Sequence, residues 1–222
     1  MSRKNNVEIQ AWPDEHILRT VAGTGEDRFE EKKSVFIGAA APVSTEEEAA
    51  AFVALRRKAY PDARHHVWAY ILSDGRSARY SDDGEPQGTG GLPMLEVLKK
   101  SGVENTVAVV TRYFGGILLG TGGLTRAYAK GAQVALAAAG IVTYYPLSVY
   151  EIRCDYGNYQ KIQKELSSAP CRIDRSDFGE DVSLILEIRS REAEKWMRSL
   201  TDLTGGRMSF RQTGEKFGLL EK

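Results

Sequence analysis

The stretch TRYFGGILLGTGGLTRAY, residues 111–128, decides the fold of the N-terminal half of the chain. It continues the apolar run VAVV, which predicts a buried strand, and a helix is expected from about Leu124 to Ala139, where Gly140 ends it. One face of that helix is small, with alanines and Gly131 at three- and four-residue spacing. Small residues let a helix backbone approach its neighbour, so we expect this helix to pack closely at Gly131.

The rest of the N-terminal half alternates strand and helix patterns. Residues 19–43 indicate two strands around a charged turn, and HHVWAYIL, residues 65–72, alternates as a further strand. Between them Ser44 and Glu47 have the spacing of a capping box, which predicts that a helix begins there. LPMLEVLKKSG, residues 92–102, predicts another helix that ends at its glycine.

The C-terminal half has its own order of elements. TYYPLSV, residues 143–149, breaks the pattern with Pro146 and predicts a domain junction. Strand, helix, strand, strand, helix and strand patterns follow, in VYEIRCDY, YQKIQKELSSA, CRIDRSDF, VSLILEIR, REAEKWMRSL and RMSFRQTG. This βαββαβ order is typical of a ferredoxin-like module. We therefore expect an α+β protein with domains at 1–143 and 144–222.

Composition bounds the function classes. The 30 basic and 30 acidic side chains cancel, so no global field attracts nucleic acid or an anionic membrane, although a local patch remains open. Cys154 and Cys171 are too few for a disulfide framework or a zinc site, which predicts two reduced thiols in or near a core. The polar N-terminus lacks a signal sequence, and the apolar run 131–142 is too short to span a bilayer. These features predict a cytoplasmic protein that is not associated with a membrane.

The glycines of residues 115–123 suggest a phosphate-binding turn. Gly115 and Gly120 have the spacing of a Walker A loop, but Thr121 and Gly122 stand in place of its lysine and hydroxyl residue. A dinucleotide GxGxxG pattern fails as well, because Thr125 stands where its third glycine should be. What remains is a helix N-terminus whose amides, near Arg126, could hold a phosphate or a carboxylate. The alternative is that the glycines serve positive φ angles and tight packing.

An acidic turn, SDDGEP, raises a similar choice. Asp82, Asp83 and Glu85 could coordinate Mg²⁺ through oxygen ligands, or they could shape a turn by binding backbone amides. His65 and His66 point to opposite faces of their strand, so they make a poor metal pair. No GxSxG, HExxH or CxxC motif is present. No cofactor is therefore predicted, with Mg²⁺ at the acidic turn as the one alternative.

SDDGEPQGTGGLPML and VVTRYFGGILLGTGGLTRAY together resemble the signature of the IMPACT family, which joins a glycine and two apolar runs to an Arg-aromatic-aromatic-Gly-Gly segment that ends in Leu-Gly. In this chain the pattern runs from Gly91 to Gly120. HHVWAY and, less specifically, the C-terminal half extend the resemblance to nearly the whole chain.

The resemblance implies a fold and a field of activity. The first domain would be the α/β sandwich shared by a ribosomal protein's second domain, the fourth domain of elongation factor G and a superfamily of small-molecule kinases. The second would be similar to the ferredoxin-like final domain of elongation factor G. Eukaryotic relatives regulate translation during amino-acid starvation by binding the activator of a stress kinase, and they carry an additional N-terminal interaction domain. This chain has the ferredoxin-like module instead, as in a bacterial member.

We therefore expect a non-catalytic binding protein associated with translation or its regulation, whose partner is RNA, the ribosome or a regulatory protein. On the predicted surface Arg112 and Arg126 hold an anion of the ligand, and Tyr113 or Phe114 stacks against the ligand. Its expected residues are Arg112, Tyr113, Phe114, Gly115, Gly116, Gly120, Gly122, Gly123, Arg126, Thr89 and His65, with Asp82, Asp83 and Glu85 as the alternative metal ligands. The alternative function is a phosphate-handling or metal-assisted enzyme that uses the acidic and glycine-rich turns. The sequence makes no prediction of the oligomeric state.

Overall fold

The computed structural model describes residues 17–72 and 77–220, which group into two compact units. One unit is Leu18–Thr143 and the other contains residues 144–220. Each unit has its own hydrophobic core. The predicted mixed α+β class with two domains is confirmed. The first 16 residues of the predicted N-terminal domain lie outside the described residues.

The N-terminal unit is built on an antiparallel sheet with the strand order β2-β3-β6-β4-β5. These strands are β2 (Gly25–Glu31), β3 (Ser34–Pro42), β6 (Thr106–Tyr113), β4 (His65–Ile71) and β5 (Ala78–Ser81). A short strand, β1 (Leu18–Val21), precedes them and is tied to the unit by the amide of Glu104, which donates to the carbonyl of Arg19. The central strand β6 is buried along almost its whole length, as its apolar sequence predicts.

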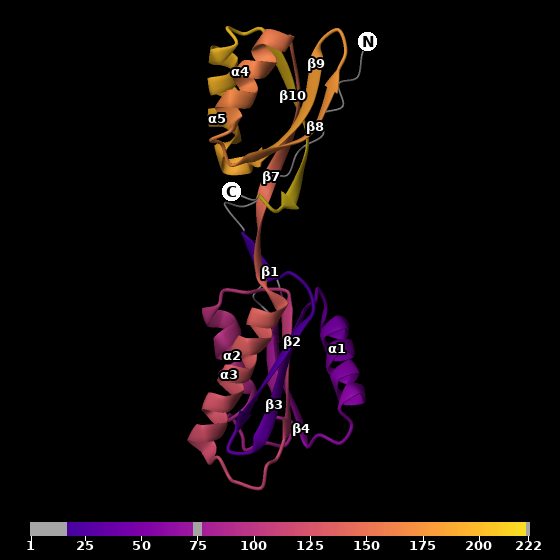
Figure 1. Cartoon of the computed structure of the whole chain (residues 1–222), viewed down its shortest axis with the longest axis vertical. Coiled ribbons are helices and arrows are strands. Elements are labelled where there is room, and N and C mark those ends of the chain that lie inside the picture. The colour runs from indigo at the N-terminus through magenta and orange to yellow at the C-terminus, as the bar shows by residue number, and fades with distance from the viewer. Residues whose placement is uncertain (1–16, 73–76, 221–222) are drawn as a thin grey trace. The chain divides into compact units, whose positions relative to one another are not determined.

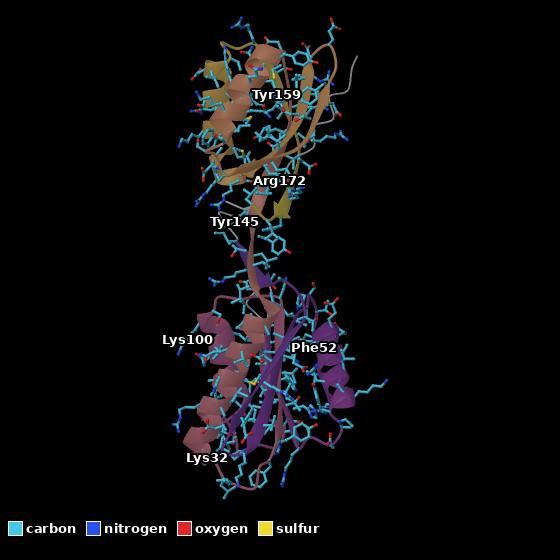
Figure 2. All side chains as sticks on the ribbon, in the orientation of Figure 1. Lys32, Phe52, Lys100, Tyr145, Tyr159 and Arg172 are labelled. Carbon is cyan, nitrogen blue, oxygen red and sulfur yellow. The ribbon has the colours of Figure 1, made fainter. Side chains whose placement is uncertain are left out.

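Helices cover both faces of this sheet (Figure 1). α1 (Glu46–Ala59) lies on one face, where its Phe52 is buried, and Figure 2 labels that side chain between helix and sheet. α2 (Gly91–Lys100) and α3 (Thr121–Ala139) lie on the other face and enclose the larger core, which includes Met94 and Tyr128. The unit is therefore a three-layer sandwich with β6 at its centre.

α3 approaches the sheet as closely as its small residues predict. A Cβ atom added at Gly131 would lie 2.7 Å from Val110 Cγ2 of β6, and one added at Gly38 of β3 would contact the carbonyl oxygen of Gly131. Neither contact leaves room for a methyl group. The glycines of strand and helix thus permit a backbone-to-backbone approach, and the predicted close packing is confirmed.

Two helix starts differ from the prediction. The N-cap of α1 is Thr45, whose hydroxyl accepts from the amide of Glu48, while the Glu48 carboxylate accepts from the amide of Ser44. The capping box is therefore real but lies one residue later than predicted, because two adjacent hydroxyl residues both satisfy the pattern. α3 begins at Thr121, three residues before the expected Leu124. Gly122 and Gly123 belong to its first turn despite the low helix propensity of glycine.

The C-terminal unit has the predicted ferredoxin-like topology. Its elements are β7 (Ile141–Cys154), α4 (Tyr156–Leu166), β8 (Cys171–Phe178), β9 (Val182–Arg189), α5 (Ser190–Leu203) and β10 (Met208–Gly218). The strands pair antiparallel in the order β10-β7-β9-β8, and both helices pack on one face (Figure 1). The βαββαβ prediction is confirmed.

Pro146 does not break the chain as predicted. It lies inside β7, a continuous strand of 14 residues, and pairs with Phe217 of β10. Pairing with β9 begins only at the next residue, Leu147, so Pro146 has a strand neighbour in this unit on one side. The strand therefore continues through Pro146, and the expected break in the pattern is not observed.

Both cysteines are free, and burial raises the pKa of each thiol, in Cys171 to about 11. We expect native protein to react slowly with a disulfide reagent at pH 8, because the reactive thiolate is the minor form until the pH nears these raised values. The rate should increase as the pH rises and should jump when urea unfolds the chain. Release of the chromophore, followed with and without urea, measures this; equally fast labelling of the folded protein would contradict it.

Candidate functional site

The end of β6 brings two predicted site residues side by side. Arg112 pairs in register with His65 of β4 on one side and with Phe36 of β3 on the other. Cross-strand partners share a face of the sheet, so all three side chains lie on the face that α2 and α3 cover. Tyr113 follows in sequence and must point to the opposite face. Its hydroxyl donates to Asp62 at 2.8 Å, and partial burial together with this bond raises the pKa of Tyr113.

Arg112 is not a free surface cation. Only 6% of the residue is exposed, and its Nη1 donates to Glu85 Oε1 at 2.6 Å. The same oxygen accepts from the hydroxyl of Tyr128 at 2.7 Å, and His65 Nε2 lies 3.8 Å from it. Burial and the adjacent Glu85 raise the pKa of Tyr128 far above its ordinary value, so the hydroxyl keeps its proton and remains a donor. The expected anion-binding role of Arg112 is therefore replaced by a buried pair with Glu85.

The acidic turn is held by hydrogen bonds within the chain. Asp82 accepts from the amides of Gly88, Gly90 and Gly91, at 2.8–2.9 Å, and so orders the start of α2. Asp83 accepts from the amide of His66 at 2.6 Å and from Arg57 Nη2.

Asp83 and Gly84 have φ angles of 44° and 85°, as a tight turn requires. His66, whose amide binds this turn, is buried, and the burial lowers the pKa of its ring. Thr89 is buried, and its hydroxyl donates to the carbonyl of Pro86. Within residues 17–72 and 77–220 no group of three His, Cys, Asp or Glu side chains converges for a metal. Mg²⁺ at this turn stays a prediction, and the turn interpretation accounts for the observed bonds.

Three of the five glycines in the glycine-rich segment are needed by the fold itself. A Cβ at Gly115 would overlap the backbone of Lys33. Gly116 and Gly120 have φ angles of 81° and 72°, which glycine adopts without strain. At these positions the protein's own backbone, rather than a ligand, accounts for the missing side chain.

Gly122 has no such internal reason. It lies in the exposed first turn of α3, has an ordinary φ angle, and an added Cβ would meet only Arg126 Nη1, at 3.6 Å. Gly123 is tighter, because its Cβ would lie 3.0 Å from that of Leu119. The amides of a first helical turn lack intrahelical acceptors, and the residues Thr121 and Gly122 are exposed. Anion binding at this helix N-terminus stays a prediction.

Two hollows flank this N-terminus. The larger, of about 410 Å³, lies above the Arg112–Glu85 pair and is lined by Arg64, His65, Gly84, Glu85, Pro86, Arg112, Phe114, Leu118, Leu119, Gly120, Thr121 and Leu124. The smaller, of about 210 Å³, is lined by Phe29, Glu31, Lys32, Leu119, Gly123, Arg126, Ala127 and Lys130. Leu119 borders both. We call the exposed first turn of α3 with these two hollows the α3 surface.

The α3 surface unites part of the predicted site. Glu85, Arg112, His65, Phe114 and Gly120 line the larger hollow, whereas Asp82, Asp83 and Tyr113 do not. Among the described residues neither Arg64 nor Arg126 has an acidic partner, and both are exposed. Because Arg112 is paired with Glu85, the unpaired cations of the α3 surface include Arg64 and Arg126 among the described residues.

Two family models match the chain, one in each unit. The Impact N-terminal domain matches residues 32–136 and the domain of unknown function DUF1949 matches residues 152–207. IMPACT family member YvyE of Bacillus subtilis is 37% identical over 198 residues, which cover 89% of this chain and 91% of the relative. The chain belongs to the IMPACT family.

Further relatives of this IMPACT family protein agree. IMPACT family member YigZ of Escherichia coli is 40% identical over 178 residues, 79% of this chain and 87% of that protein. A solved structure titled "Crystal structure of an hypothetical protein" is 36% identical, with a TM-score of 0.56 over 90% of this chain and 98% of its own. No described helix has the length and apolarity to cross a membrane.

Sequence reasoning missed three contributors to the site. Arg64 lines the larger hollow from the residue before β4, and Tyr128 reaches Glu85 from the second turn of α3. The sequence patterns assigned no role to Leu118, which is 81% exposed. Whether a leucine in this loop is exposed depends on the packing around it, so this sign requires the structure.

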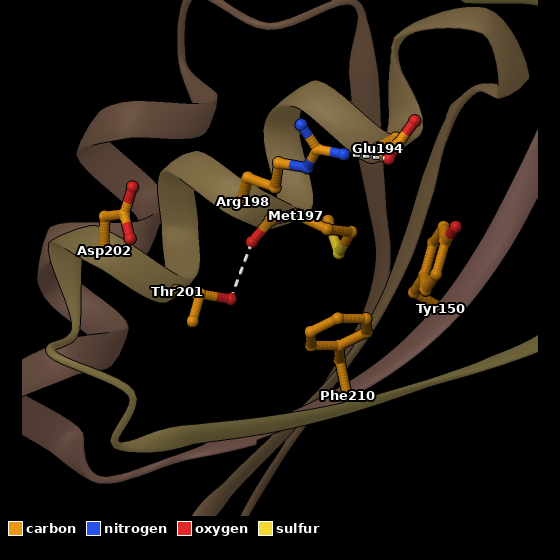
Figure 3. A pocket seen from close by; sticks show the side chains of 7 residues that line it. All are labelled: Tyr150, Glu194, Met197, Arg198, Thr201, Asp202 and Phe210. Atoms are coloured by element: carbon orange, nitrogen blue, oxygen red, sulfur yellow. Dashed lines mark hydrogen bonds and ion pairs between the residues drawn. The ribbon is translucent and has the colours of Figure 1, made fainter.

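The C-terminal unit of the IMPACT family protein has a hollow of its own, about 470 Å³, between α5 and the sheet (Figure 3). Tyr150, Met197 and Phe210 form its apolar lining. Its rim carries the paired charges Glu194 and Arg198, and the Thr201 hydroxyl donates to the carbonyl of Met197. Most of its polar groups are already satisfied, so this hollow offers less specific chemistry than the α3 surface.

Proposed function

We propose that this IMPACT family protein is a non-catalytic binding protein of the translation apparatus that holds RNA by its phosphates on the α3 surface. The observation that carries the proposal is Gly122, an exposed helix-start glycine that neither φ angle nor packing requires. Its lack of a side chain leaves the first-turn amides open to a ligand that approaches closely.

Charge on the surface favours an anionic ligand. Arg126 stands one turn after those amides, Lys32 and Lys130 line the adjoining hollow, and Arg64 lines the other. The chain as a whole is neutral, so this local cluster is the feature that would attract a phosphate backbone. Exposed Phe114, Ile117 and Leu118 beside the cations add the stacking and apolar contacts that single-stranded RNA uses.

The place in translation rests on the family. Eukaryotic relatives in the IMPACT family regulate translation. Both modules of this chain also resemble domains of translation factors. We expect the protein in the cytoplasm, where such RNA is available.

Salt dependence tests the proposal. Binding of a fluorescent single-stranded RNA should weaken steeply as salt rises, because each neutralised phosphate releases counterions. Arg126→Ala should reduce the slope of log K against log salt by about one unit, since it removes one phosphate contact. Anisotropy titrations at several salt concentrations measure the slope. A flat response, or none to RNA and capture of an acidic protein instead, would refute the RNA proposal.

A companion variant separates binding from folding. Gly122→Glu places a negative charge in the first turn of α3, which should stabilise the helix by about 0.5 kcal/mol and yet repel phosphate. Gly157→Glu is the matched control, because Gly157 is the exposed second residue of α4 in the other unit. We expect RNA affinity to fall in the first variant far more than in the second, with neither Tm lowered.

A phosphate-handling enzyme is the second candidate. The observation in its favour is the buried carboxylate of Glu85 under a hollow next to a helix start. Calorimetry with Mg²⁺ and nucleotides decides between the two: saturable nucleotide binding that depends on Asp83 supports the enzyme, and RNA binding without it supports the binding protein.

A further inference from the structure

The floor of the larger hollow presents an unused carboxylate oxygen. Glu85 Oε1 accepts from Arg112 and Tyr128. The second oxygen, Oε2, has no hydrogen-bond partner among the described residues and is not one of the fully enclosed atoms, so it opens to the hollow that Glu85 lines. A side chain this deeply buried, with one oxygen left over, points to a donor supplied from outside.

His65 adds a second acceptor beside the Glu85 carboxylate. Its Nδ1 lies 2.8 Å from the carbonyl oxygen of Asp83, which can only accept, so Nδ1 carries the hydrogen. In the neutral ring Nε2 therefore presents a lone pair, and it lies 3.8 Å from Glu85 Oε1 on the wall of the same hollow. Two neighbouring acceptors with no donor between them suit a ligand that carries two neighbouring N–H groups.

The walls suit a flat ring. Phe114, 43% exposed, Pro86 and Leu118 surround the opening with apolar surface. Arg112 lies over the Phe114 ring at 5.6 Å and so fixes its position. A hollow of about 410 Å³ falls in the size range of small-molecule sites, and an aromatic ligand could stack on the free part of Phe114.

We propose that the larger hollow receives an unpaired guanine base of the bound RNA. The Watson–Crick edge of guanine carries two adjacent donors, N1–H and the N2 amino group, which match Glu85 Oε2 and His65 Nε2. Adenine carries one donor and one acceptor on that edge, cytosine one donor and two acceptors, and uracil a single donor, so each leaves an acceptor unsatisfied. Thr121 and Gly120 line the mouth of the hollow, which places the base next to the helix start that holds the phosphate.

This inference rests on the proposed RNA binding and gives it a base preference. The full chain is titrated with short oligouridines that carry one central guanosine, inosine or adenosine, with fluorescence anisotropy as the readout. Inosine differs from guanosine only in lacking the N2 amino group. We expect guanosine to bind about tenfold tighter than adenosine or plain oligouridine, with inosine in between, and duplex RNA to lose the preference.

Variants assign the preference to the hollow. His65→Phe keeps a ring of similar size and removes the acceptor, so the guanosine-to-inosine ratio of affinities should fall toward one. Arg126→Ala, which touches phosphate only, is the matched control and should weaken all the oligonucleotides by the same factor. A thermal melt of each variant checks that it is folded.

The outcomes separate the two proposals. Equal affinities for guanosine, inosine and adenosine with a steep salt dependence would overturn the guanine site and leave phosphate binding standing. A guanosine preference that survives His65→Phe unchanged would also overturn it. Absence of binding to every RNA would overturn both.

Discussion

Glu85→Ala is expected to lower the free energy of unfolding of the N-terminal unit by about 3–5 kcal/mol. The substitution leaves the guanidinium of Arg112 buried without its counter-charge and removes the acceptor of the Tyr128 hydroxyl. Arg112 and Tyr128 are both buried, so the loss of their shared partner is costly even though the hollow above Glu85 can admit water. Urea unfolding followed by circular dichroism measures the change.

A double substitution is the control for this effect. Replacing both partners, as Glu85→Leu with Arg112→Met, removes the charge pair and leaves no uncompensated ion, so much of the stability should return. Glu96→Ala, which breaks an exposed pair with Lys99, should cost far less than Glu85→Ala. Equal losses in Glu85→Ala and the double variant would mean that the pair's charge is not what the core depends on.

The Glu85 cluster also shows why the sequence predicted the site only in part. Arg112 lies 27 residues from Glu85, and Tyr128 lies 43 residues from it. The sequence shows that each of these residues is present, but their contact depends on the pairing of β6 with β4 and on the placement of α3. The sequence therefore predicted an exposed Arg112, where the sheet produces a buried one.

The fold was more predictable because its signals are local. The apolar run of β6, the small face of α3 and the βαββαβ order of the C-terminal unit each follow from periodicity within one element or from element order. Pro146 was misjudged for the opposite reason. Whether a proline interrupts a strand depends on which side has a neighbour, and that is a property of the sheet.

Gly38→Ala is expected to lower the stability of the N-terminal unit by about 3 kcal/mol, although it adds only one methyl group. The new Cβ would meet the carbonyl oxygen of Gly131, which belongs to the backbone of α3 and cannot rotate away as a side chain could. The helix would have to lift from β3 and β6, and its contacts in the main core would loosen together. Thermal and urea unfolding measure the loss.

Gly122→Ala is the matched control, since it makes the same chemical change in the first turn of α3, where the added methyl group would clash with nothing. Alanine is a better helix residue than glycine by about 1 kcal/mol, so this variant should be at least as stable as the parent. The contrast follows from the two reasons for which the chain uses glycine: at Gly38 the fold occupies the space, and at Gly122 it leaves the space open. Equal stability of the two variants would show that α3 does not rest on the sheet backbone as closely as the structure indicates, and would remove the ground for assigning the open glycine to a ligand.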